Sequence, residues 1–232
     1  MPRLGIRRTW GGYEMTAVTE RNQRLSRLGA WMGIAFTVLF VVGLIAFPFP
    51  SNDKSAAQWA RQWTDSGHRT TAIVATYLVV LGLLAFLWFA WSLRDRIRAD
   101  GDGLMLTFGS VFVAVSLVAA LVQAAIPGAK VFGDSPVPTG SFAQVLSDVS
   151  SGILFVAGGL SAGAFIAVAS YLARRTGLLP GWLTIAGYVV AVLQLVAAFF
   201  VPFLLFPLWV LIVSIVLLRR RAPATAPTAP NR

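Results

Sequence analysis

The stretch TTAIVATYLVVLGLLAFLWFAWSLRDRIR, residues 70–98, decides the fold of this chain. Residues 70–93 carry no charge, and three arginines, Arg94, Arg96 and Arg98, follow at once. The hydrocarbon core of a bilayer is about 30 Å thick, and a helix of about 20 apolar residues crosses it. The stretch therefore predicts a transmembrane helix that ends on the basic side of a membrane.

The composition of the whole chain agrees with a membrane setting. Of 232 residues, 57% are apolar and 12% are charged, whereas soluble domains are about 25% charged. One soluble core could not bury so much apolar surface, so lipid is the expected solvent. The chain has no cysteine and one histidine, which excludes thiolate metal sites and paired-histidine haem ligation. We expect no cofactor and no metal.

Five further spans are predicted from the remaining apolar runs: 28–49, 104–126, 152–173, 182–200 and 203–218. The last two come from one uncharged stretch, 183–218, which as a straight helix would be roughly 54 Å long. Pro202 and Pro207 disfavour a continuous helix there, so we expect a tight hairpin. The predicted fold is an all-α bundle of six transmembrane helices at 28–218. A basic, partly disordered segment at 1–27 precedes it, and a disordered tail at 219–232 follows it.

The distribution of charge predicts how the chain is threaded. With six spans, 15 lysines and arginines fall on one face of the membrane and four on the other, and the acidic residues divide as five and four. The positive-inside rule then places both termini in the cytoplasm, with the protein in the plasma membrane. The basic residues are spread over every loop of one face instead of forming one patch, which argues against a nucleic-acid partner. The lipid bilayer is the expected partner.

The first outer loop contains AAQWARQW, residues 56–63, whose apolar residues recur at helical spacing. We expect a short interfacial helix, capped by Ser51 or Asp53, that lies on the bilayer or caps the bundle. Trp59 and Trp63 would be interfacial anchors at headgroup depth. A lid over an outer opening is the alternative.

Ionisable residues within membrane spans usually mark transport paths, and this sequence places none at mid-depth. The nearest candidates form a tentative polar site at the outer mouth, made of His68, Arg69 and Asp148. A structural pairing of Asp148 with Lys130, Arg69 or His68 is favoured over a substrate or proton site.

Other residues point to contacts between helices. Gln123 and Gln194 are expected to make interhelical hydrogen bonds, with a polar pocket between them as the alternative. Small residues at four-residue spacing predict close helix packing, within the chain or with a homo-oligomer or partner helix, at Gly29, Gly33, Gly159 and Gly163.

Three stretches carry a resemblance to a known group: the outer-loop helix, WFAWSLRDRIR at 88–98, and RRTGLLPGWLTIAGYVVAVLQL at 174–195. Over most of 28–218 the chain resembles uncharacterised six-span integral membrane proteins of actinobacteria. The resemblance implies a membrane protein without an assigned activity and carries over no catalytic residue.

The expected function is a non-catalytic accessory or scaffold component of the cell membrane. The sequence shows no phosphate-binding loop, metalloprotease motif or nucleophile elbow. We therefore do not expect this protein to be an enzyme. One alternative is a carrier or receptor for a small apolar molecule or lipid, with an outward-facing cavity under the Trp59/Trp63 helix. Another is a membrane-embedded enzyme acting on lipid, with Asp148 and His68 as its acid–base pair.

Overall fold

The computed structural model describes residues 11–48, 55–133, 136, 139–196 and 200–219. The predicted tail beyond Arg219 and the first ten residues lie outside this part. Within it, every regular element is a helix, in this order: α1 (Gly11–Ala46), α2 (Ala56–Gln62), α3 (Ser66–Ile97), α4 (Asp102–Gly133), α5 (Gly140–Gly152), the π-helix η1 (Ile153–Gly158), α6 (Gly159–Arg175), α7 (Gly181–Leu193), the 3₁₀-helix η2 (Gln194–Val196) and α8 (Phe200–Arg219).

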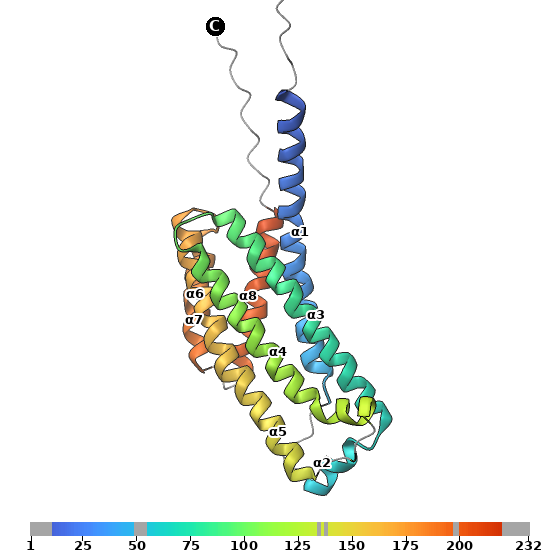
Figure 1. Cartoon of the computed structure of the whole chain (residues 1–232). Helices are drawn as coiled ribbons and strands as arrows, with labels where there is room; N and C mark the ends of the chain where they lie inside the picture. Colours follow the sequence, from blue (N-terminus) through green and yellow to red (C-terminus); the bar gives the residue numbers. More distant parts are fainter. Residues whose placement is uncertain (1–10, 49–54, 134–135, 137–138, 197–199, 220–232) are drawn as a thin grey trace, which may run out of the picture.

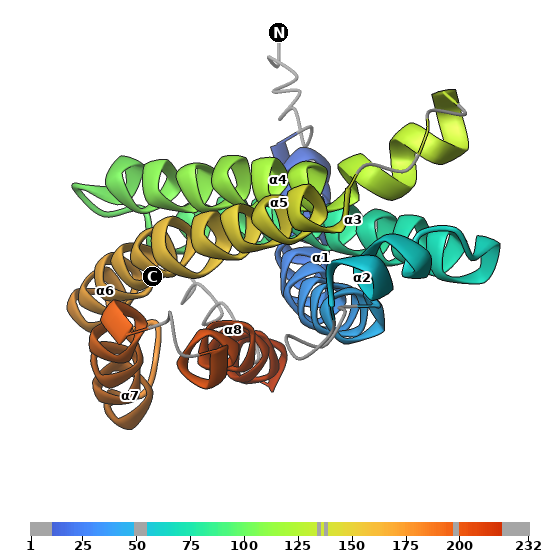
Figure 2. The same ribbon diagram turned by 90° about the horizontal axis from the view of Figure 1, so that it is seen from below.

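The helices form an elongated bundle (Figure 1). Its basic end, where α8 finishes, carries Arg27, Arg94, Arg96, Arg98, Arg174, Arg175 and Arg219. The opposite end is covered by α2 and is called the α2 end below. Viewed from the α2 end, α7 lies at the edge of the bundle beside α6 (Figure 2).

Five helical stretches in the described residues are long and apolar enough to cross a membrane: Arg27–Ala46, Ser66–Ile97, Asp102–Gly133, Gly140–Arg175 and Val201–Arg219. The protein is therefore an all-α polytopic membrane protein, as predicted. The predicted fifth span is a shorter apolar helix, Gly181–Val196. This helix is shorter than the roughly 20 residues that a straight crossing needs.

Several helix boundaries differ from the prediction. α1 begins at Gly11, inside the segment expected to be partly disordered, and the fourth span begins at Gly140 instead of residue 152. α4 continues through Pro127 to Gly133, where the prediction ended it at Ile126. Pro127 offers no N–H to the carbonyl of Gln123, and the last turns of α4 bend away from the bundle (Figure 2).

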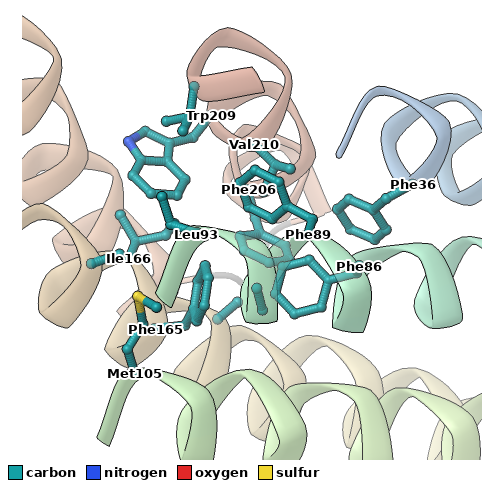
Figure 3. Packing of buried hydrophobic residues seen from close by; sticks show 14 of the residues in the cluster. Phe36, Phe86, Phe89, Leu93, Met105, Phe165, Ile166, Phe206, Trp209 and Val210 are labelled. Carbon is teal, nitrogen blue, oxygen red and sulfur yellow. The ribbon is translucent and has the colours of Figure 1, made fainter. Parts of the chain in front are cut away.

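Phenylalanine rings from α1, α3, α4, α6 and α8 fill the centre of the bundle, and Figure 3 shows several of them. Eight of them are less than 2% exposed: Phe36, Phe40, Phe86, Phe89, Phe112, Phe165, Phe203 and Phe206. The ring of Phe112 lies 4.7 Å from that of Phe206 and 5.3 Å from that of Phe86, centroid to centroid, with inclined ring planes. Inclined aromatic pairs contribute about 0.5–1.5 kcal/mol each beyond the apolar area they bury. The middle of the bundle is thus closed by apolar contacts.

Glycines bring neighbouring helices into close contact. The four predicted packing positions, Gly29, Gly33, Gly159 and Gly163, are all buried. A Cβ atom on Gly29 would collide with Ser92 of α3, and one on Gly163 would lie 2.9 Å from Cβ of Gln194 and 3.0 Å from the carbonyl oxygen of Ala191. The predicted packing within the chain is therefore confirmed for these two positions.

Candidate functional site at the α2 end

The short helix α2 begins with a reciprocal cap. The hydroxyl of Ser55 accepts a hydrogen bond from the backbone N–H of Gln58 at 3.4 Å, and the side-chain oxygen of Gln58 accepts one from the N–H of Ser55 at 3.0 Å. Such a capping box satisfies two free donors and stabilises a helix start. Gln62 then donates to the carbonyl of Pro48 at 2.7 Å, which fastens α2 to the end of the first span.

Trp59 and Trp63 point into the bundle. Each is only 3% exposed, and they pack in a small cluster with Phe47, Ala72 and Ile126 among others. The prediction that these indoles anchor the chain at headgroup depth is wrong. The apolar face of α2 instead covers the end of the bundle, because the adjoining ends of α3, α4 and α5 offer it an apolar surface. The capping alternative describes α2 correctly.

Tryptophans that do face outward lie near the basic end, and they were not among the predicted anchors. Trp31, Trp88, Trp91 and Trp182 are 45–60% exposed, and each lies within about two helical turns of an arginine in the chain. Indoles concentrate at the membrane–water interface. Their closeness to arginines in the sequence was the signal from which an interfacial belt of tryptophans could have been predicted.

His68 and Arg69 occupy the corner between α2 and α3. Nδ1 of His68 lies 2.8 Å from the carboxylate of Asp65, and Arg69 donates to the backbone carbonyls of Trp63 and Thr64 at 3.0 Å each. The N–H of Gly67 bonds the Asp65 carboxylate at 2.8 Å. Two contacts lower the pKa of Asp65. The larger effect comes from the hydrogen bond with Gly67, and the next from the contact with His68.

Around this corner is a shallow groove of about 390 Å³ lined by Gln58, Arg61, Gln62, Asp65 and His68. Asp148 lies apart from it, exposed on α5, and no ion pair joins it to His68 or Arg69. The predicted pairing of Asp148 with either residue is therefore wrong. The local partner Asp65, three residues before His68, is better placed for the imidazole.

A cavity of about 50 Å³ lies between α1, α3, α4 and the α5–η1 segment. Its polar lining consists of Thr76, Ser116, Gln123, Ser150 and Ser151. Ser150 donates to the carbonyl of Ala119 at 2.8 Å, and Thr76 donates to that of Ala72 at the same distance. No charged side chain lines the cavity.

Two polar atoms of this lining have no protein partner in the described part of the chain. They are the hydroxyl of Ser116, a residue 1% exposed, and the side-chain oxygen of Gln123. The amide nitrogen of Gln123 does have one, because it donates to Ser147 at 3.2 Å. A buried polar group without a partner costs about 1–3 kcal/mol, so each of these two atoms marks a separate place where a small polar group could bind.

The π-helix η1 forms one wall of the cavity, through Leu154 and Phe155. A π-helix changes the phase of the side chains around the helix axis, and such segments are frequent at functional sites. Here Ser150, before η1, faces α4, while Gly158 at its end lies against Ser116: a Cβ atom on Gly158 would be 3.8 Å from the Ser116 hydroxyl.

A smaller cavity of about 10 Å³ lies directly under α2, lined by Trp59, Trp63 and Ser147 among others. Gln123 lines both cavities. The indole N–H groups of Trp59 and Trp63 also have no protein partner among the described residues. Polar groups with free bonding capacity therefore extend from α2 to Ser116 through Gln123.

Gln194 acts elsewhere in the bundle. Its amide donates to the carbonyl of Pro202 in α8 at 2.9 Å, and it lines a separate groove between α6 and α7. Both glutamines make the predicted interhelical hydrogen bonds, and they line different pockets.

In the residues that the structure describes, no three His, Asp or Glu side chains gather as a metal site would require. Comparisons of the chain with protein-family models, curated proteins and solved structures found no match. Fold and site together define the class as a polytopic membrane protein with a small, mainly apolar cavity near one end that contains a few uncharged polar groups.

Proposed function

We propose that this protein is a non-catalytic accessory component of the plasma membrane. The observation that carries the proposal is the closed centre of the bundle, where rings such as Phe86, Phe112 and Phe206 are fully buried against one another. Solute and proton paths through membrane proteins normally carry ionisable groups at mid-depth. The described spans carry their charges near their ends instead, and none lies among these rings.

The proposed orientation places the basic end in the cytoplasm. That end carries the arginines of α1, α3, α6 and α8 and the outward-facing tryptophans, which agrees with the positive-inside rule and an interfacial aromatic belt. Because the chain has no cysteine, single cysteines give a clean test. In intact cells a membrane-impermeant maleimide should label Ser66→Cys at the α2 end. It should label Asp100→Cys at the basic end only after permeabilisation; the reverse pattern would invert the orientation.

The accessory role is tested by native purification and by transport measurements. A tagged full-length chain, solubilised in mild detergent and analysed by native mass spectrometry, should carry the same membrane-protein partners in reproducible stoichiometry. The same chain in proteoliposomes should not increase proton or potassium flux above that of empty vesicles. A partner-free monomer that moves solute would overturn the proposal.

A second candidate function is a receptor or carrier for a lipid-like molecule. The cavity between α1, α3, α4 and the α5–η1 segment favours it, because its lining includes polar atoms without a protein partner, and a tightly packed bundle would offer such a ligand no site. The third expectation, a lipid-acting enzyme, gains no support: His68 is paired with Asp65, and Asp148 stands apart.

A further inference from the structure

The edge of the bundle formed by α6 and α7 carries an open groove of about 340 Å³ (Figure 2). No charged side chain lines this groove. On α6 its lining consists of Leu160, Gly163, Ala164 and Ala167. Three of these four residues are small, so the groove leaves room beside α6 for a slender apolar chain.

The same face of α6 continues from the groove to two arginines of the basic end. Tyr171 follows Ala167 after four residues, and Arg174 and Arg175 follow it after seven and eight. Such spacing keeps side chains on one side of an α-helix. Tyr171 and both arginines are exposed. The guanidinium carbon of Arg175 lies 5.7 Å from the ring centre of Tyr171, so Arg175 is turned back along α6 toward the groove.

The contacts between α6 and α7 place Trp182 level with these arginines. A Cβ atom on Gly163 of α6 would meet Ala191 of α7, and farther toward the basic end one on Gly187 of α7 would meet Ser170 of α6. The two helices are therefore antiparallel neighbours, and their register brings Trp182 beside the end of α6. Trp182 is 60% exposed, and exposed indoles favour the headgroup layer of a bilayer.

The two arginines carry positive charge that no acidic side chain offsets within the described part of the chain. No ion pair joins Arg174 or Arg175 to a carboxylate there, whereas Asp95 and Asp102 are paired with other arginines of the basic end. Arginine binds phosphate oxygens through charge-assisted hydrogen bonds, often two at a time. A headgroup that combines a phosphate with a net negative charge therefore complements this pair.

The distances along α6 fit one leaflet of a bilayer. At about 1.5 Å per residue, the groove extends from about 10 Å below Arg174, at Ala167, to about 21 Å below it, at Leu160. One leaflet contributes about 15 Å of hydrocarbon beneath its headgroups, half of the bilayer core. An acyl chain whose phosphate lies at the two arginines therefore reaches the groove.

We propose that the α6–α7 pair binds an anionic phospholipid of the leaflet next to the basic end, with its phosphate at Arg174 and Arg175 and one acyl chain in the groove. This site is separate from the cavity of the second candidate function. It depends neither on that function nor on the accessory role, which concerns protein partners.

The test uses the purified full-length chain in detergent micelles, with palmitoyl-oleoyl phosphatidylglycerol and palmitoyl-oleoyl phosphatidylcholine as probes. Native mass spectrometry in an equimolar mixture should show at least about fivefold more bound phosphatidylglycerol, because each arginine near an anionic headgroup contributes roughly that factor. Replacing both residues, Arg174→Gln with Arg175→Gln, should abolish the preference. Thermal unfolding of each variant checks that it is folded.

Matched variants separate this site from its surroundings. Arg27→Gln with Arg219→Gln removes the same charge from α1 and α8 at the same end of the bundle and should keep the preference. Ala167→Phe fills the groove and should lower phosphatidylglycerol binding about fivefold or more, since overfilling a fitted contact costs at least that factor. Val189→Phe is its control, because Val189 is an exposed residue of α7 that does not line the groove.

Equal binding of the two lipids by the unaltered chain would overturn the proposal. An equal loss of preference with the two arginine pairs would also overturn it, because binding would then follow the total charge of the basic end. An equal response to Ala167→Phe and Val189→Phe would show that the groove holds no acyl chain, and the proposed site would fail. Native purification without protein partners would overturn the accessory role and leave this lipid site standing.

Discussion

Replacing Gly163 by alanine tests whether the short helix α7 is held in the bundle by close backbone contact with α6. The new Cβ atom would lie 2.9 Å from Cβ of Gln194 and 3.0 Å from the carbonyl oxygen of Ala191. Neither atom can rotate away, because one is attached directly to the backbone and the other belongs to it. Carbon atoms pack best at about 3.5–4.0 Å, so α7 must move outward by about 0.6 Å or more.

The cost follows from two opposing terms. Overpacking of a tight contact costs about 1–3 kcal/mol, and a helical alanine gains about 0.5–1 kcal/mol over glycine. The displacement would also strain the bond from Gln194 to the carbonyl of Pro202, which ties η2 to α8. We therefore expect Gly163→Ala to lose about 1–2 kcal/mol of unfolding free energy.

The measurement is reversible unfolding of the purified protein in mixed micelles with increasing sodium dodecyl sulfate, followed by tryptophan fluorescence. Gly152→Ala is the matched control, because nothing lies within 4 Å of a Cβ atom built on Gly152. That variant should be unchanged or more stable. The reasoning is refuted if Gly163→Ala unfolds at the same detergent fraction as Gly152→Ala.

Three further predictions use the same unfolding assay. Trp63→Ala removes an indole that is 3% exposed and should cost about 3–5 kcal/mol, whereas Trp182→Ala, at a site 60% exposed, should cost much less; equal losses would contradict the capping role of α2. Thr37→Val removes a hydroxyl 3.0 Å from the carbonyl of Pro207 and should cost about 0.6 kcal/mol; no loss would show that this bond adds nothing. The carboxylate of Asp65 has a lowered pKa, so its contribution is present above the ordinary carboxyl pKa and is lost as the pH falls through the lowered value. Asp65→Asn should flatten this part of the pH profile, and an unchanged profile would contradict it.

Hydropathy predicted the fold class and the positions of most spans, because a span needs only length and apolar composition. Helix ends were less predictable. Nothing in the count of apolar residues reveals that α4 continues past Pro127. The start of α2 was misplaced at Ser51 or Asp53, both outside the described residues, although Ser55 with Gln58 three residues later is a recognisable capping-box pattern.

The candidate site was harder to predict, because it depends on which face of each helix turns inward. Helical spacing placed Trp59 and Trp63 on one face of α2, but it could not tell whether that face meets lipid or protein. Gln123 was recognised as a hydrogen-bonding residue. Ser116 was not, because a lone serine in an apolar span gives no signal until the neighbouring helices are placed. The contact of His68 with Asp65, by contrast, was open to prediction, because Asp65 lies only three residues earlier in the sequence.

The number of residues in the π-helix η1 helps to determine which side chains form the cavity wall. Each residue of an α-helix turns the chain by about 100°, so deleting one residue between Ile153 and Gly158 would rotate all of α5 relative to α6 by about that angle. Ser150 would then leave the Ala119 carbonyl, and Ser147 would leave Gln123. A single-codon deletion or insertion could therefore dismantle or create this polar wall without exchanging any of the residues that form it.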